Sequence, residues 1–135
     1  MEFRNYNANP KGWKTGDCVV RAIAKATGQT WEDVYFSLCK IGAKKCRMPN
    51  DKKVYETYLE DLGWVKHKQP RTDDGRKYTV KEFLDGYMYG TANQYVIFTM
   101  ASHMSCAYFT EYGEEPELID IWKCSYKCVS NYWTH

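Results

Sequence analysis

Cys18 is the residue of this chain best placed to do covalent chemistry. At this cysteine the polar, glycine-containing segment 14–17 changes into an apolar pattern with helical spacing. A thiol in the first turn of a helix faces unpaired backbone N–H groups and the positive end of the helix dipole, which both stabilise the thiolate. The position of Cys18 therefore predicts a nucleophile for acyl transfer, and such a nucleophile needs a histidine and a carboxylate from elsewhere in the chain.

His103 is the histidine best suited to serve Cys18 as a general base. Of the other two, His67 adjoins a charged loop and His135 is the last residue given. A general base has to lie within hydrogen-bond reach of its nucleophile. We therefore expect the fold to bring His103 to Cys18, although a strand-end histidine bonded to a backbone carbonyl is the simpler structural alternative.

Asp120 is the carboxylate that a hairpin would bring to His103. A turn through residues 112–116 lays residues 103–110 against residues 117–122, so His103 and Asp120 fall nearly opposite each other on one face. Cross-strand partners have Cβ atoms about 4.5–5.5 Å apart, close enough for an imidazole and a carboxylate to bond. A one-residue change in register would break this pairing. The alternative is that Asp120 begins a turn or pairs with a neighbouring lysine.

Three amphipathic helices are expected to position Cys18, after an irregular lead-in over residues 1–15. Each combines apolar residues at helical spacing with a start signal and a glycine at its end. The helices are predicted from about Gly16 to Thr27, from a capping Thr30 to Gly42, and from a capping Asn50 to Gly63. In the first of them, Arg21 and Lys25 mark the side expected to face solvent.

The second half of the chain has the periodicity of strands, which would carry His103 and Asp120. Thr79 is expected to cap one short helix before the main strands. Runs rich in β-branched and aromatic residues predict strands over 64–67, 95–100, 105–110, 118–122 and 129–133. Helices followed by an antiparallel sheet define an α+β fold, and the length suits one domain spanning residues 1–135.

A cysteine at the start of an N-terminal helix, a histidine at the head of a strand and an aspartate on the following strand, in that chain order, resemble the papain-like cysteine peptidase superfamily. More closely, three short segments are similar to small bacterial and phage proteins related to the bacteriocin-processing peptidase domain of peptide exporters. These segments are Thr15-Gly16-Asp17-Cys18-Val19-Val20-Arg21-Ala22-Ile23, Ser102-His103 and Asp120-Ile121-Trp122. The resemblance implies a papain-like fold and a cysteine peptidase without a cofactor, acting on a peptide or protein substrate. It implies Cys18 as nucleophile, His103 as general base and acid, and Asp120 as the orienting residue.

The oxyanion hole departs from the pattern of that superfamily. Papain-like peptidases place a glutamine a few residues before the nucleophile, and this chain has none before Gln29. The nearest amide is Asn9, and the indole N–H of Trp13 is another possible donor; Asp17 and Trp122 are expected beside the substrate cleft. Loss of one oxyanion donor costs roughly a hundredfold to a thousandfold in turnover. The sequence thus leaves open a weakly active or inactive scaffold that binds peptides or proteins, and also a thiol acyltransferase with the same triad.

The other cysteines suggest a metal site as a further alternative. Four thiols, Cys39, Cys46, Cys124 and Cys128, could hold zinc, but their spacings lack the two-residue knuckle of structural zinc sites. Cys106 alternates to the sheet face opposite His103 and is expected in the core. Cys18 itself could be a small packing residue, since free cysteines are commonly buried. The favoured interpretation has no metal.

The composition of the chain gives no indication of a nucleic-acid or membrane partner. The formal net charge is +2, from 19 basic and 17 acidic residues spread along the chain, which gives no electrostatic argument for nucleic acid. The basic residues between Lys40 and Lys53 are not accompanied by aromatic residues on which bases could stack, so a solvated loop is expected there. The start of the chain lacks a secretion signal and no apolar run reaches membrane-spanning length. A cytoplasmic protein with free thiols and no membrane partner is expected.

Overall fold

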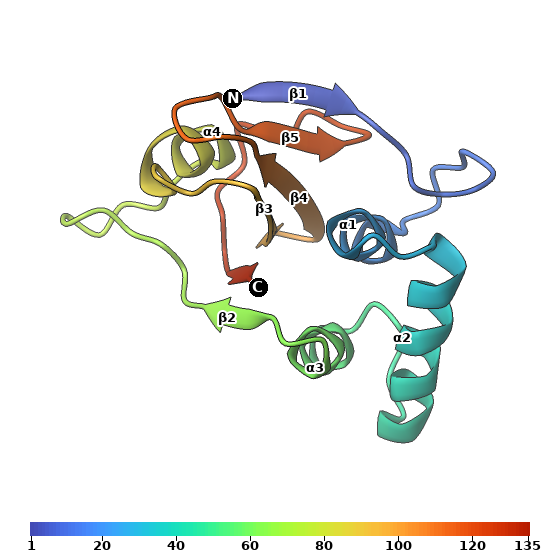
Figure 1. Ribbon diagram of the computed structural model, residues 1–135. Coiled ribbons are helices and arrows are strands. Elements are labelled where there is room, and N and C mark those ends of the chain that lie inside the picture. Colours follow the sequence, from blue (N-terminus) through green and yellow to red (C-terminus); the bar gives the residue numbers. More distant parts are fainter.

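Three helices occupy the first half of the chain in the computed structural model, which describes all 135 residues (Figure 1). They are α1 (Cys18–Thr27), α2 (Trp31–Lys45) and α3 (Lys52–Asp61). α1 begins at the cysteine itself, because Asp17 is its N-cap residue, and it ends at Gly28 in the left-handed conformation (φ 68°) as expected. None of the helices has the length and apolar character that crossing a membrane requires.

The ends of α2 and α3 differ from the sequence prediction. α2 continues through Gly42 to Lys45, because this glycine serves a close approach of the chain: a Cβ atom there would lie 2.5 Å from the backbone oxygen of Arg47. The cap of α3 is Asp51 and not Asn50. The Asp51 carboxylate accepts a hydrogen bond from the backbone N–H of Lys53, and its charge complements the helix dipole. Neither difference moves Cys18 from the start of α1.

The strands form one six-stranded mixed sheet in the order β1-β5-β4-β3-β6-β2. Their bounds are β1 (Glu2–Asn5), β2 (Val65–His67), β3 (Gln94–Met100), β4 (His103–Phe109), β5 (Glu117–Asp120) and β6 (Tyr132–Thr134). The expectation of a purely antiparallel sheet was wrong, because β1 pairs in parallel with β5. The expected irregular lead-in is wrong for residues 2–5, which form β1, and holds for residues 6–15. The sequence did not reveal β1 because its side chains, mostly exposed, lack an apolar alternation, and pairing at the sheet edge holds it.

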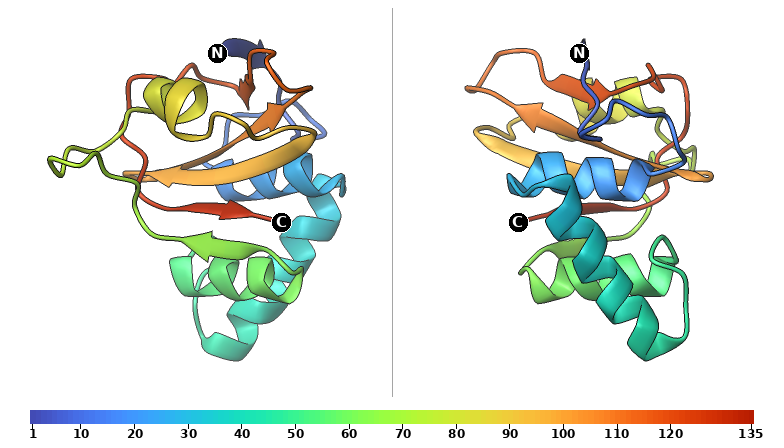
Figure 2. Two further views of the ribbon diagram at one scale, coloured as in Figure 1. Left: turned by 60° about the vertical axis from the view of Figure 1, so that its left-hand side comes forward. Right: turned by 90° about the vertical axis from the view of Figure 1, so that its right-hand side faces the viewer.

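The two faces of the sheet carry separate cores. α1 packs on one face, where Ile23, Ile97 and Trp133 are buried. Thr79 caps the short helix α4 (Val80–Glu82), as predicted, and the structure adds a capping box with Glu82. The chain continues as a π-helical turn, η1 (Phe83–Tyr87). This segment covers the opposite face over Phe98 and Leu118, and Figure 2 shows α4 and α1 on opposite sides of the strands. The architecture is α+β, with α1 held against the strands that carry His103 and Asp120.

The hairpin of β4 and β5 has a register two residues away from the predicted one. Cys106 pairs with Ile119 and Ala107 with Leu118, which places Asp120 level with Ser105 and diagonal to His103. Because the difference is two residues and not one, His103 and Asp120 keep the same face of the sheet. The structure therefore preserves their proximity although they are not opposite each other.

Candidate functional site

Cys18, the first residue of α1, opens onto a groove that it shares with His103. The groove has a volume of about 430 Å³, and helix α3, the β3–β4 turn and the loop before β6 contribute to its walls. Its lining residues are Cys18, Val19, Asn50, Lys52, Tyr55, Thr99, Met100, Ser102, His103, Met104, Ser130 and Asn131. The backbone N–H of Cys18 lies in the first turn, where no helical acceptor exists for it. A carbonyl group in the groove can therefore meet both the sulfur and this N–H.

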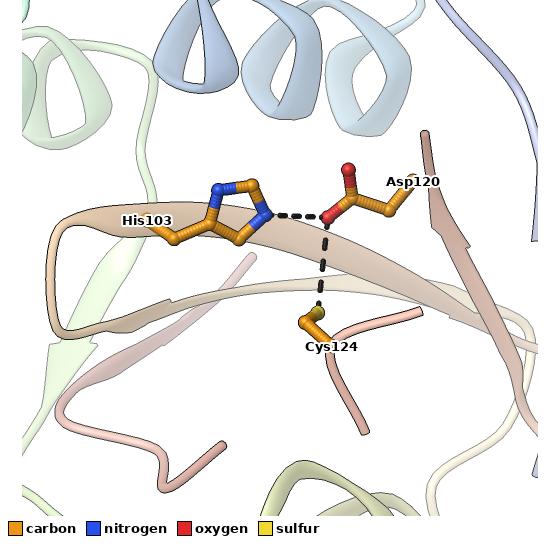
Figure 3. A group of neighbouring side chains, drawn as sticks. All are labelled: His103, Asp120 and Cys124. Atoms are coloured by element: carbon orange, nitrogen blue, oxygen red, sulfur yellow. Dashed lines mark hydrogen bonds and ion pairs between the residues drawn. The ribbon is translucent and has the colours of Figure 1, made fainter. Parts of the chain in front are cut away.

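His103 and Asp120 are hydrogen-bonded partners. Nε2 of His103 lies 2.7 Å from Oδ2 of Asp120, whose side chain is 3% exposed (Figure 3). The other carboxylate oxygen, Oδ1, accepts a hydrogen bond of 2.7 Å from the backbone N–H of Ile121. Figure 3 shows the second ring nitrogen, Nδ1, on the side of the imidazole away from Asp120, toward the helices. With Nε2 engaged, Nδ1 is the nitrogen left to exchange a proton with Cys18.

The charges of this site favour an ion pair between Cys18 and His103. Burial acts to raise the pKa of the Cys18 thiol, but hydrogen bonds to His103 and to the backbone of Met104, with the charges of His103 and Arg21, lower it overall. Burial also acts to lower the pKa of His103, yet its bonds to Asp120, Cys124 and Cys18 raise it to about 11. The structure thus supports a thiolate beside an imidazolium.

Asp120 stays ionised in spite of its burial. Burial acts to raise the pKa of its carboxyl group, whereas hydrogen bonds with His103 and Ser105 and with the backbone N–H of Ile121 lower it overall. A buried carboxylate with three such partners is both fixed in orientation and kept as an anion. It therefore orients the imidazole and stabilises its protonated form.

Asp17 and Asn9, which were expected near the cleft, belong to a buried hydrogen-bond network next to Cys18. Nδ2 of Asn9 and Nε1 of Trp31 donate to Oδ2 of Asp17, at 3.1 Å and 2.8 Å. The side-chain amide of Asn9 is thereby bonded to Asp17. Oδ1 of Asp17 pairs with Nη1 of Arg21 at 2.5 Å. The expectation that Arg21 faces solvent was wrong, because Arg21 is 8% exposed and this ion pair is what allows its burial.

The two tryptophans named from the sequence lie differently. The Trp122 ring stands edge-on to the imidazole of His103, with ring centroids 4.9 Å apart, and Trp122 does not itself line the groove. Trp13 is 62% exposed, and the ammonium group of Lys11 lies 5.6 Å from its ring. Trp13 does not line the groove, whereas Asn50, which sequence reasoning missed, does.

One cluster of side chains contains ligand types that bind metal ions, but two of its atoms, Nε2 of His103 and Oδ2 of Asp120, are spaced as hydrogen-bond partners. The ligand atoms of His103, Asp120 and Cys124 lie within 4.8 Å of one another (Figure 3). Two ligand atoms that each lie about 2.0–2.2 Å from one tetrahedral zinc ion would stand roughly 3.3 Å apart. This separation is larger than the 2.7 Å between Nε2 of His103 and Oδ2 of Asp120. Of the four thiols considered from the sequence, only Cys124 belongs to this cluster. Cys106 is buried in the core on the α1 side of the sheet.

Comparisons with known proteins add no family to this description. No protein-family model, no curated protein and no solved structure matches the chain. The site is therefore characterised by the geometry and charges of its own residues.

Proposed function

We propose that this protein is a papain-like cysteine peptidase, which cleaves a peptide or isopeptide bond with Cys18, His103 and Asp120. The observation that carries the proposal is the buried His103–Asp120 hydrogen bond beside a thiol at a helix N-terminus, within an open groove. The lowered pKa of Cys18 and the raised pKa of His103 both favour the reactive ion pair. Six free thiols agree with action in a reducing compartment such as the cytoplasm.

In the first half of the reaction, the Cys18 thiolate attacks the carbonyl carbon. The carbon–sulfur bond forms while the carbonyl π electrons move onto oxygen, where the backbone N–H of Cys18 can stabilise the charge. His103 then gives its Nδ1 proton to the amine nitrogen. The carbon–nitrogen bond breaks with its electron pair on nitrogen, and an acyl thioester remains on Cys18.

In the second half, neutral His103 takes a proton from water as the oxygen attacks the thioester. The carbon–sulfur bond breaks, Cys18 leaves as a thiolate, and the imidazolium is restored. Asp120 keeps the imidazole in one orientation throughout. An amine in place of water would make the same site an acyltransferase, so product analysis has to include added amine acceptors.

Alkylation by iodoacetamide at graded pH, followed by peptide mapping, tests the proposal. We expect Cys18 to react at pH values well below the ordinary cysteine pKa, and His103→Ala to abolish that reactivity. His67→Ala is the matched control, because His67 bonds Thr134 at 2.8 Å and has no role at Cys18. Release of products from a peptide library, lost in Cys18→Ala, tests turnover. A Cys18 that reacts no faster than the other five thiols would sink the catalytic interpretation.

A further inference from the structure

A buried ion pair lies next to the nucleophile at the start of α1. The side chains of Asp17 and Arg21 are 6% and 9% exposed, and they lie one turn apart across the start of α1. Asp17 is further fixed by hydrogen bonds from Asn9 and Trp31. Burying a guanidinium and a carboxylate carries a large desolvation cost, which packing alone would not require at this position.

The same guanidinium reaches toward the carboxylate of Asp120. Nη2 of Arg21 lies 4.0 Å from Oδ1 of Asp120, while Nη1 is bound by Asp17. His103 engages the other oxygen of Asp120, Oδ2. Arg21, Asp120 and Cys18 also line one small hollow. The Asp120 carboxylate thus has one cationic side chain near each of its oxygens.

We propose that Arg21 is a positioning residue for the Cys18–His103–Asp120 site, and that Asp17 fixes its guanidinium so that it holds Asp120 from the side opposite His103. This inference rests on the proposed function. The planar fork of arginine suits the role because two nitrogens can serve two carboxylates at once, which a lysine ammonium cannot do with the same geometry.

The surrounding charges give the sign of the expected effect. The titratable or charged groups facing this region are Tyr6 from the lead-in, Asp17, Cys18 and Lys25 at α1, Tyr55 from α3, His103 from β4, Asp120 from β5 and Cys124. Arg21 contributes a positive charge that favours the Cys18 thiolate. Without it, Asp120 and Asp17 are left with less compensation, so Cys18 should lose its proton only at higher pH.

The pH dependence of Cys18 alkylation measures this role. For Arg21→Met we expect the midpoint of the alkylation curve to rise by about one pH unit, which is about a tenfold slower reaction on the acidic side of the curve. Arg21→Lys should give a smaller rise in the same direction. Lys25→Met is the control, because it removes the same charge one turn farther along α1, where Lys25 lies over the ring of Tyr6.

A double variant separates positioning of Asp120 from simple loss of charge. Arg21→Met combined with Asp17→Asn removes one positive and one negative charge, so the local net charge is unchanged. A midpoint that stays raised in the double variant supports the contact with Asp120. A midpoint that returns to the wild-type value assigns the effect to an uncompensated Asp17 and overturns the proposal.

Folding and the parent proposal are kept separate by the same measurements. Thermal unfolding of each variant shows whether it folds; if Arg21→Met does not, Arg21→Lys decides, and an unshifted midpoint there overturns the inference. Wild-type Cys18 with an ordinary thiol titration would refute the proposed function itself. If the alkylation midpoint of Cys18 is low in the wild type but equal in Arg21→Met and Lys25→Met, only the role of Arg21 is refuted.

Discussion

Nε2 of His103 lies 2.7 Å from Oδ2 of Asp120, and both residues stand at the ends of neighbouring strands. His103 is the first residue of β4 and Asp120 is the last residue of β5. Strand ends leave side chains beside a groove while the backbone is still fixed by the sheet. Asp120 is fixed further because Asn5 of β1 pairs with it and the backbone N–H of Tyr6 donates to its carbonyl oxygen at 3.0 Å. The N-terminal strand therefore helps to position the carboxylate.

Asp120→Asn should narrow the pH range in which the site works. Removing the carboxylate takes away the strongest contribution that raises the pKa of His103 to about 11, while burial, which lowers that pKa, remains. The imidazolium needed to protonate the leaving amine would then be lost at a much lower pH. We expect turnover to fall by about a hundredfold or more, as for orienting carboxylates in other triads, and kcat/KM against pH checks this. An unchanged alkaline limb in Asp120→Asn would contradict the role of Asp120.

The wild-type protein should show a wide pH plateau in single-turnover acylation. The acidic limb reports the lowered pKa of Cys18, since the thiol must be ionised, and the alkaline limb reports His103 with its pKa of about 11.

The raised pKa of His103 also means that the native state binds this proton more tightly than the unfolded chain does. Its contribution to stability is complete below the ordinary histidine pKa and is lost as the pH rises toward about 11. Unfolding of wild type and His103→Ala at matched pH values measures that difference.

Local signals in the sequence were sufficient for the elements that position the nucleophile. Apolar periodicity and the glycine at position 28 located α1, and Thr79 as a cap residue located α4, because helices and caps are specified by neighbouring residues. The Cys18, His103 and Asp120 cluster was also predicted, since period-two alternation survives a two-residue difference in register. β1 was missed because its stability comes from pairing with β5, a contact distant in sequence.

Arg21 shows why the remainder of the site was not predicted. A helical arginine is normally exposed, and only the spacing of four residues from Asp17 hinted at an ion pair. Its burial depends on Trp31 and Asn9, which bond Asp17 from two other segments. Such a network is a property of the assembled chain, and no local pattern reports it.

The six cysteines should react with alkylating agents in a defined order. Cys18 is expected first, then the exposed Cys46 and Cys128, and then the half-buried Cys39. Cys106 and Cys124 are 1% and 0% exposed, and burial raises the pKa of Cys106 to about 12, so both should react only after unfolding. Timed alkylation with peptide mapping, with and without denaturant, checks the order. Early labelling of Cys124 would show that the region behind Asp120 opens in the native state.

Thr79→Ala should destabilise the fold without affecting Cys18. The Thr79 hydroxyl accepts a hydrogen bond from the backbone N–H of Glu82, and the Glu82 carboxylate accepts one from the backbone N–H of Thr79. Loss of the cap is expected to cost about 1 kcal/mol of unfolding free energy. Thr57→Ala is the matched control, since the Thr57 hydroxyl bonds only the backbone oxygen of Lys53 within α3. Denaturant unfolding measures both, and the alkylation midpoint of Cys18 should be unchanged in each.

Gly42→Ala should be among the more damaging single-methyl additions to this chain. The new Cβ atom would lie 2.5 Å from the backbone oxygen of Arg47, so either α2 or the following loop has to shift, at a cost of about 1–3 kcal/mol. Gly86→Ala provides the control, because a Cβ atom there meets nothing within 4 Å. The control should be neutral or slightly stabilising, since alanine restricts the unfolded chain. Because the loop after Arg47 leads to Asn50 and Lys52 in the groove wall, a shifted loop should also slow peptide cleavage while leaving Cys18 alkylation intact. Equal stability of the two alanine variants would show that the 42–47 contact is relaxed in solution.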